Sequence, residues 1–171
     1  RSILVMGDMW GLVDVVITTY DLQKAEPYII SSLNPQHSDV TLAEAVLGTT
    51  CVPGFFPPSK SIINDREVAL VDGSVFAVDP SLSGYVEAYD GDEEVLLISL
   101  GTGETKLDIN YDKCKKWGII QWLFSLKGVQ MIFDGLSDST GSLVKTLVEK
   151  NGGKYYRVQV QVSPFMFVGF D

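Results

Sequence analysis

The chain has 171 residues, of which 46% are hydrophobic and 20% are charged, and this composition is typical of one folded globular domain. Its formal net charge of −9 argues against nucleic acid as a partner, because binding to phosphates depends on lysine and arginine. Its two cysteines, Cys51 and Cys114, form neither a disulfide framework nor a metal-ligand spacing. We therefore expect free thiols, a cytoplasmic location and no metal site.

The beginning of the sequence carries little information on targeting. It starts with arginine rather than methionine and enters a strand-like run almost at once. No apolar run approaches the roughly 18 residues of a membrane span. We therefore expect a piece of a longer protein.

The first half of the chain alternates strand-like runs with one helix. β-branched residues at 13–20 (VDVVITTY) predict a buried strand, and 28–32 (YIISS) predict a second strand after a hairpin-type connection. Thr41 and Glu44 have the spacing of a capping box at the start of a short helix. Three prolines and a glycine exclude regular structure from 51–60 (CVPGFFPPSK), which we expect to be an apolar loop packed onto a neighbour.

The middle of the chain continues the alternation. The run at 67–71 (EVALV) predicts a strand that ends at Asp72, and Pro80 is suited to begin a helix. The continuous apolar run at 94–100 (EVLLISL) is typical of a strand covered on both faces.

The last third has two helical patterns and one alternating pattern. Helical spacing at 117–133 predicts a first helix, and 137–153 predicts a separate, capped helix that ends near Gly152. Clean alternation at 155–162 predicts a half-exposed strand at or near a sheet edge. Strands interleaved with helices predict an α/β fold with a mostly parallel sheet, in one domain.

The stretch LVDGSVFAVDP at 70–80 places a carboxylate directly after an apolar strand. The carboxyl ends of strands are the usual place for chemistry in α/β folds, and Gly73 allows another group to approach the backbone closely. The residues alone leave two interpretations open for Asp72: an ordinary Asp-Gly turn, or a general base.

Four segments together carry a resemblance to a known family. They are ITTYDLQKAEPYIISS, LAEAVLGTTCVPGFFPP, LVDGSVFAVDP and VLLISLGTGET, in this order. The chain resembles the patatin-like phospholipase family over nearly its whole length. The resemblance implies a three-layer α/β domain with a mostly parallel central sheet, of which residues 1–171 are the C-terminal part. It also implies that Asp72, followed by Gly73, is the base of a Ser-Asp dyad.

The sequence departs from the family pattern at three places. Ser74 follows the Asp-Gly pair where the family has glycine or alanine, and Val78 and Asp79 replace two amides. The chain also lacks a Gly-x-Ser-x-Gly nucleophile elbow and a glycine-rich oxyanion loop. In the family both precede this region, so the resemblance implies a serine upstream of Arg1.

No other residue is a convincing nucleophile or base. Ser74, Ser99 and Ser142 each adjoin or lie near a glycine, but none stands in an elbow sequence. His37, the only histidine, lies in the polar turn NPQHSD, where we expect a solvated side chain. Cys51 has apolar neighbours and is expected to be an inert core thiol.

The resemblance implies a lipid acyl hydrolase of the phospholipase A type, with a lipid ester as substrate and no metal or organic cofactor. Two aromatic clusters, Phe55 with Phe56 and the segment 117–124, could line an acyl channel or make transient contact with a membrane surface, which would make the protein peripheral at membranes. Core packing is the other interpretation of both clusters. The alternative function is a catalytically inactive patatin-like module that binds lipid or a protein.

Overall fold

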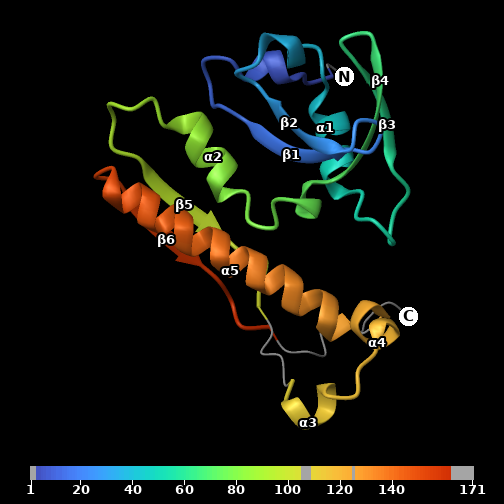
Figure 1. Ribbon diagram of the computed structural model, residues 1–171. Helices are drawn as coiled ribbons and strands as arrows, with labels where there is room; N and C mark the ends of the chain where they lie inside the picture. The colour runs from blue at the N-terminus through green and yellow to red at the C-terminus, as the bar shows by residue number, and fades with distance from the viewer. Residues whose placement is uncertain (1–2, 105–108, 125, 163–171) are drawn as a thin grey trace. The chain divides into compact units, whose positions relative to one another are not determined.

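The computed structural model describes residues 3–104, 109–124 and 126–162, with the backbone alone described at 123–124 and 126–127 (Figure 1). The chain divides into two compact units, Arg1–Glu87 and Ala88–Asp171, called unit 1 and unit 2 below. None of the described helices combines the length and the apolarity that a membrane span requires.

Unit 1 is built on a four-stranded sheet with the order β2-β1-β4-β3. Its elements in chain order are η1 (Met6–Met9), β1 (Val16–Asp21), β2 (Glu26–Ser31), η2 (Pro35–His37), α1 (Leu42–Thr50), β3 (Ser59–Ile63), β4 (Arg66–Asp72), η3 (Gly73–Val75) and nearly all of α2 (Ser81–Ala88). Helix α1 packs against β1, β4 and β3. The core cluster consists of Met6, Ile30, Val40, Ala45, Ile63, Val68 and Leu70.

Several predicted elements of unit 1 are confirmed. Strands are present at β1, β2 and β4, and β4 ends at Asp72 as predicted. The capping box of α1 is formed: the Glu44 N–H donates to Thr41 Oγ1 at 3.0 Å, and the Thr41 N–H donates to Glu44 Oε2 at 3.1 Å. The N–H groups of Thr41 and Glu44, at the N-terminal end of α1, therefore both have side-chain partners.

The prediction of a loop as far as residue 60 is wrong at its end, because β3 begins at Ser59. Strands β3 and β4 form a hairpin in which Ile63 pairs with Arg66. Asn64 and Asp65 connect them with φ values of 53° and 58°. Positive φ at both central residues is the requirement of the tight hairpin turn that suits the twist of the strands, and Asn and Asp tolerate it well.

The fold is mixed α/β, but the expected mostly parallel sheet is not what unit 1 contains. All three strand pairs of its sheet are antiparallel. Short connections explain two of them, since β1–β2 and β3–β4 are joined by tight turns, and a parallel pair needs a crossover of a dozen or more residues. Parallel pairing among the described strands occurs between β5 (Leu96–Leu100) and β6 (Lys154–Val158).

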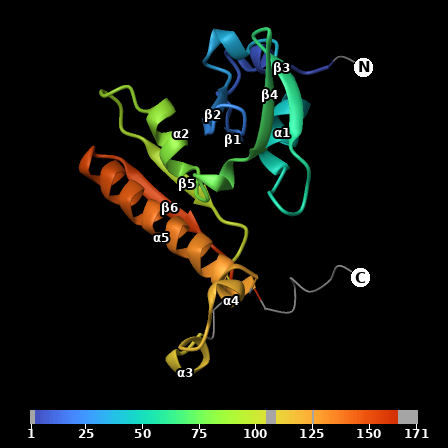
Figure 2. The ribbon, with the colours of Figure 1, turned by 45° about the vertical axis from the view of Figure 1, so that its right-hand side comes forward.

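Unit 2 consists of β5, α3 (Tyr111–Cys114), α4 (Ile119–Phe124), α5 (Leu126–Lys150) and β6. Both ribbon views show α5 running alongside the β5–β6 pair (Figures 1 and 2). The prediction of a separate helix starting at residue 137 is wrong, because α5 runs unbroken through this region for 25 residues. Its predicted end is confirmed: Gly152 has φ +81°, and the Gly153 N–H donates to the Val148 carbonyl at 2.9 Å, as in a Schellman motif.

The β5–β6 pair differs from the predicted doubly covered sheet. Ser99 of β5 is buried and Arg157 of β6 reaches Ser137 of α5, so this face of the pair lies under the helix. The alternation predicted for β6 is present, but its apolar side chains are on the exposed face. The exposed apolar residues of the pair and its continuation are Leu96, Ile98, Leu100, Tyr156, Val158 and Val160.

Candidate active site

Asp72 is the last residue of β4, at the carboxyl end of a central strand of the unit 1 sheet. It is paired with Thr19 of β1. Its N–H donates to the carbonyl of Cys51, the residue that caps α1, at 3.1 Å. Backbone bonds to two other elements therefore fix where the Asp72 side chain starts.

The carboxylate of Asp72 has one anchored oxygen. Oδ1 accepts the N–H of Ser74 at 2.7 Å and so caps the short helix η3. No described residue donates a hydrogen bond to Oδ2, and the side chain is partly exposed. The turn and the base are thus compatible interpretations, because one oxygen can hold the turn while the other accepts a proton.

Gly73 is required by close contact rather than by backbone conformation. A Cβ built on Gly73 would lie 2.3 Å from the Thr18 carbonyl oxygen and 2.4 Å from Thr18 Oγ1. The Thr18 carbonyl also accepts the Thr49 hydroxyl at 2.7 Å, which ties it to α1. Any larger residue at position 73 would have to push β1 away from the turn that holds Asp72.

Phe55 and Phe56 lie on the loop that follows Cys51, and both are exposed, at 72% and 61%. Among the described residues the pair is therefore not part of a packed core. The loop is nevertheless ordered, because both phenylalanine N–H groups donate to the Val52 carbonyl at 3.0 Å. Phe76, just after η3, is also exposed. The loop after Cys51 and the residue after η3 thus both present apolar surface to solvent.

Asp79 stands where the family pattern has an amide, and it still anchors the loop that follows Asp72. Asp79 is buried, and its Oδ1 accepts the N–H of Ser81 at 3.0 Å where α2 begins. A carboxylate oxygen accepts this bond as an amide oxygen would. The replacement therefore does not itself argue for a damaged site.

The three serines considered as nucleophiles lie in unsuitable places. Ser74 is inside η3, and Ser142 is in the middle of α5. Ser99 lies within β5, where Arg157 Nη1 donates to its Oγ at 2.7 Å. Ser99 and Ser142 do not stand at a turn from a strand into a helix, which is the geometry of a nucleophile elbow. Ser74 follows β4, but it lies inside a three-residue 3-10 helix rather than at the start of an α-helix.

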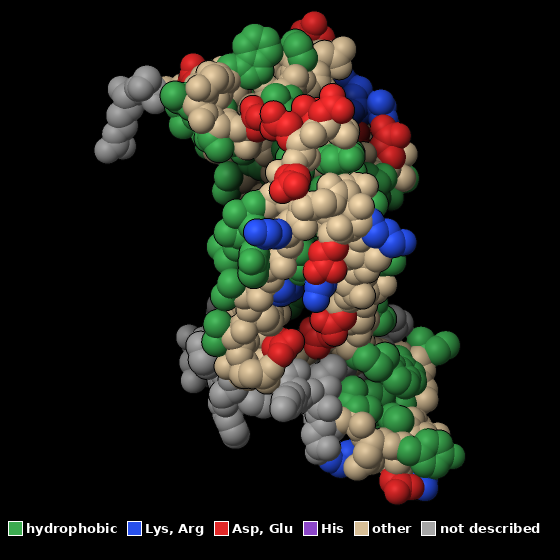
Figure 3. All heavy atoms as spheres, turned by 90° about the vertical axis from the view of Figure 1, so that its left-hand side faces the viewer, with side chains coloured by type: hydrophobic (Ala, Val, Ile, Leu, Met, Phe, Trp, Pro, Cys, Tyr) green, Lys and Arg blue, Asp and Glu red, His purple; other side chains and the backbone are tan. Residues whose placement is uncertain are grey.

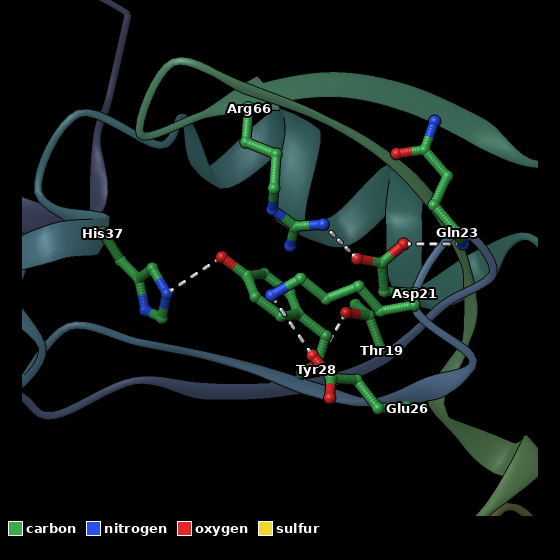
Figure 4. A network of polar contacts seen from close by, with 8 residues as sticks. Thr19, Asp21, Gln23, Glu26, Tyr28, His37 and Arg66 are labelled. Carbon is green, nitrogen blue, oxygen red and sulfur yellow. Dashed lines mark hydrogen bonds and ion pairs between the residues drawn. The ribbon is translucent and has the colours of Figure 1, made fainter.

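His37 is buried rather than solvated, so that prediction is wrong. Helix η2 turns the ring toward β2, where Nδ1 accepts the Ser31 N–H at 3.1 Å and Nε2 lies 3.3 Å from the Tyr28 hydroxyl (Figure 4). Because Nδ1 accepts a backbone N–H, the neutral ring carries its proton on Nε2. Burial lowers the pKa of His37.

Figure 4 also shows an ion pair that the sequence analysis missed. Arg66 Nη1 lies 2.6 Å from Oδ2 of Asp21, which is fully buried, and the guanidinium carbon lies 5.8 Å from the Tyr28 ring centre. Burial acts to raise the pKa of Asp21, but the hydrogen bonds from Arg66 and the Gln23 N–H outweigh it, and the pKa is lowered. Tyr28 pairs with Thr19, two residues before Asp21. Arg66 lies four residues before Leu70, which pairs with Asp21. Alternation along β1, β2 and β4 therefore places the three side chains on one face of the sheet, but the sequence did not show which strands pair.

Both cysteines are free thiols, as predicted, and Cys51 is buried with its Sγ 3.1 Å from the Leu47 carbonyl. In the part of the chain that the structure describes, no cluster of three or more His, Cys, Asp or Glu side chains could hold a metal ion. For the aromatic segment 117–124, the side chains at 123 and 124 lie outside the described residues.

Several known proteins with similar sequences carry patatin names. Patatin-like protein 1 of Arabidopsis thaliana is 34% identical over 158 residues, which cover 78% of this chain and 38% of the relative. Patatin-like protein 4 of the same plant is 31% identical over 157 residues, covering 78% of this chain and 39% of the relative. This chain belongs to the patatin-like protein family.

A third relative carries a name that concerns activity. It is the potato (Solanum tuberosum) protein named probable inactive patatin-3-Kuras 1, 31% identical over 141 residues, with 68% of this chain and 38% of the relative covered. No protein-family model matches the sequence. The chain spans less than two fifths of the length of these three relatives.

Proposed function

We propose that this chain supplies the general base of a lipid acyl hydrolase of the phospholipase A type. Asp72 is the base of a Ser-Asp dyad, and the serine comes from sequence upstream of Arg1. The observation that carries the proposal is the Asp72 carboxylate itself, held at a strand end by the Ser74 N–H with its second oxygen open. Membership of the patatin-like family supports it.

The proposed reaction needs only protein groups and water. The serine Oγ attacks the ester carbonyl carbon while its proton passes to Oδ2 of Asp72, and backbone N–H groups upstream stabilise the oxyanion. The alcohol then leaves with that proton, and the acyl group stays on the serine. Water attacks the acyl-enzyme in the same way, gives its proton to Asp72, and releases the fatty acid as the serine recovers its proton.

We further propose that Phe55 and Phe56 contact the acyl chain of the lipid. Both side chains are exposed on a loop whose first residue, Cys51, bonds the Asp72 backbone. Apolar walls with a few placed polar groups are typical of sites for such ligands. Replacing both phenylalanines with serine should raise KM for long-chain esters far more than for short-chain esters.

Residues 1–171 are proposed to be the C-terminal part of a single patatin-like domain, in which β5 and β6 belong to a larger, mostly parallel central sheet. The exposed apolar face of the β5–β6 pair supports this, because parallel sheets are normally covered on both faces. An Ile98→Cys variant tests it: the thiol should react in the 171-residue chain and be protected in a protein extended upstream.

The hydrolase itself is tested with the extended protein. It should cleave short acyl esters and react with a serine-directed phosphonate, and the mass of the adduct should map to a serine upstream of Arg1. The 171-residue chain should do neither, because loss of the nucleophile removes most of the rate of such a unit. An extended protein that neither turns over esters nor takes the label would refute the proposal.

The second candidate is a patatin-like module that binds lipid without turnover. The name of one relative, probable inactive patatin-3-Kuras 1, supports this second candidate. It predicts that the extended protein binds lipid but takes no phosphonate label.

A further inference from the structure

The segment Tyr111–Trp122 of unit 2, called the α3–α4 tip below, has an exposed apolar face. Ile119 and Ile120 are exposed at 77% and 70%, and Tyr111 and Trp122 are exposed as well. Figure 3 shows hydrophobic side chains, with a few charged ones among them, at the end of unit 2 that carries α3 and α4, at the bottom of the view. Single exposed apolar residues need no explanation, but four of them in twelve positions do.

The charges of the α3–α4 tip oppose those of the whole chain. Lys113, Lys115 and Lys116 are exposed there, against the single aspartate Asp112, although the chain has a net charge of −9. Lys115 contacts both Asp112, at 2.7 Å, and the face of the Tyr111 ring, at 5.7 Å from its centre. Lys115 therefore borders the apolar face directly.

The α3–α4 tip is also internally fixed. Trp117 and Trp122 pack edge to face with ring centres 5.1 Å apart. The Trp117 N–H donates to the Cys114 carbonyl at 2.9 Å, and the Gly118 N–H donates to Gln121 Oε1 at 3.0 Å. These contacts join the turn between the two short helices to the residues on either side of it.

We propose that the α3–α4 tip docks on the surface of a lipid bilayer that contains anionic lipids. Ile119, Ile120 and Trp122 enter the boundary between headgroups and acyl chains, where tryptophan and tyrosine are enriched, and the lysines contact the anionic headgroups. Three exposed lysines within twelve positions of a chain with net charge −9 favour an anionic surface as the occupant. The proposal does not depend on hydrolysis, since an inactive lipid-binding module needs the same surface.

The test is flotation of the 171-residue chain with vesicles of phosphatidylcholine alone or mixed with phosphatidylserine. The chain should float with the mixed vesicles, and added salt should weaken this binding. Replacing Ile119 and Ile120 together with serine should lower partitioning about tenfold or more. Replacing Lys113, Lys115 and Lys116 with glutamine should lower it about fivefold per lysine and remove its dependence on phosphatidylserine.

Matched control variants change equally exposed residues outside the α3–α4 tip. Ile62→Ser combined with Leu143→Ser removes two apolar side chains that are 73% and 67% exposed. Lys24→Gln, Lys60→Gln and Lys145→Gln together remove three exposed charges. Both controls should bind vesicles like the unmodified chain, and circular dichroism should show every variant folded.

Three results would overturn the proposal. They are no flotation with either vesicle, flotation that the tip variants leave unchanged, or a chain that forms dimers in solution which the two isoleucine substitutions dissociate. The last result would assign the surface to a second copy of the chain. None of them bears on ester hydrolysis, which is measured separately with soluble short-chain esters.

Discussion

Gly73→Ala should destabilise unit 1 strongly, because the added Cβ has no room. It would lie 2.3 Å from the Thr18 carbonyl oxygen, and real Cβ atoms do not approach other atoms that closely. Thr18 cannot move freely, since its carbonyl accepts the Thr49 hydroxyl and it lies in β1 between two paired strands. Overpacking of this kind costs about 1–3 kcal/mol, and the involvement of backbone puts this case at the upper end.

Gly84→Ala is the matched control in the same unit. Gly84 lies inside α2, and a Cβ there meets nothing within 4 Å. Alanine should therefore stabilise the helix by about 0.5–1 kcal/mol. The two glycine substitutions thus have opposite expected signs, although the chemical change is identical.

Urea unfolding followed by circular dichroism measures both variants. At about 2–4 °C per kcal/mol for a chain of this size, Gly73→Ala should also lower the melting temperature by roughly 6–12 °C. If Gly73→Ala were as stable as Gly84→Ala, the close approach between the Asp72 turn and β1 would not exist, and the described geometry of the site would be refuted.

Three further predictions concern polar groups of unit 1. Asp72→Ala should cost about 1 kcal/mol of unfolding free energy through loss of the cap on η3, whereas Asp72→Asn, whose amide oxygen still accepts the bond, should cost little; the difference in urea midpoints checks this. Because burial lowers the pKa of His37 below 6.5, the unfolded chain binds this proton first as the pH falls, so stability should drop below about pH 6.5. His37→Gln should show a smaller drop in urea midpoint between pH 7.5 and pH 5.5, and an unchanged drop would contradict the assignment. Arg66→Met leaves the buried Asp21 unpaired and should lower the urea midpoint far more than Lys60→Met, which breaks an ion pair with both side chains more than half exposed; equal effects would contradict the buried pair.

Local patterns predicted most elements of the fold. The β-branched run of β1, the capping box of Thr41 and Glu44, the strand end at Asp72 and the glycine cap at Gly152 depend on neighbours in the sequence, and all are confirmed. The β3–β4 hairpin was missed although Asn64 and Asp65 supplied its turn signal. Prolines just before β3 led the prediction to extend the loop too far.

What could not be predicted depends on contacts distant in the sequence. The antiparallel pairing of β1 with β4 joins strands far apart in the sequence, and the alternation of apolar residues is the same for both directions. The other two antiparallel pairs, β1–β2 and β3–β4, follow from their short connections. His37 is buried because η2 turns it against β2, whereas its polar neighbours in the sequence had predicted a solvated side chain. The continuous α5 includes Gly135 and Gly141. Glycine lowers the stability of a helix relative to alanine, but tertiary context can outweigh this preference.

For the candidate site, the sequence predicted the position of Asp72 but not how it is held. An Asp-Gly pair after a strand indicated a turn, and the family resemblance indicated a base. The bond from the Ser74 N–H shows how one carboxylate can serve the turn and keep an oxygen open. The contact of Gly73 with Thr18 had no local signal, because it joins residues more than fifty positions apart.

Turnover of the Asp72→Asn variant, made in the protein extended upstream of Arg1, tests the central claim most directly. Asparagine keeps the size and the bond to Ser74 but cannot take a proton from the serine, so kcat for a short acyl ester should fall by about 10²–10⁴-fold with an unchanged melting temperature. Asp39→Asn, at an exposed position away from the Asp72 turn, is the matched control and should keep full turnover. If Asp72→Asn also kept full turnover, Asp72 would be a turn residue and not the base of this enzyme.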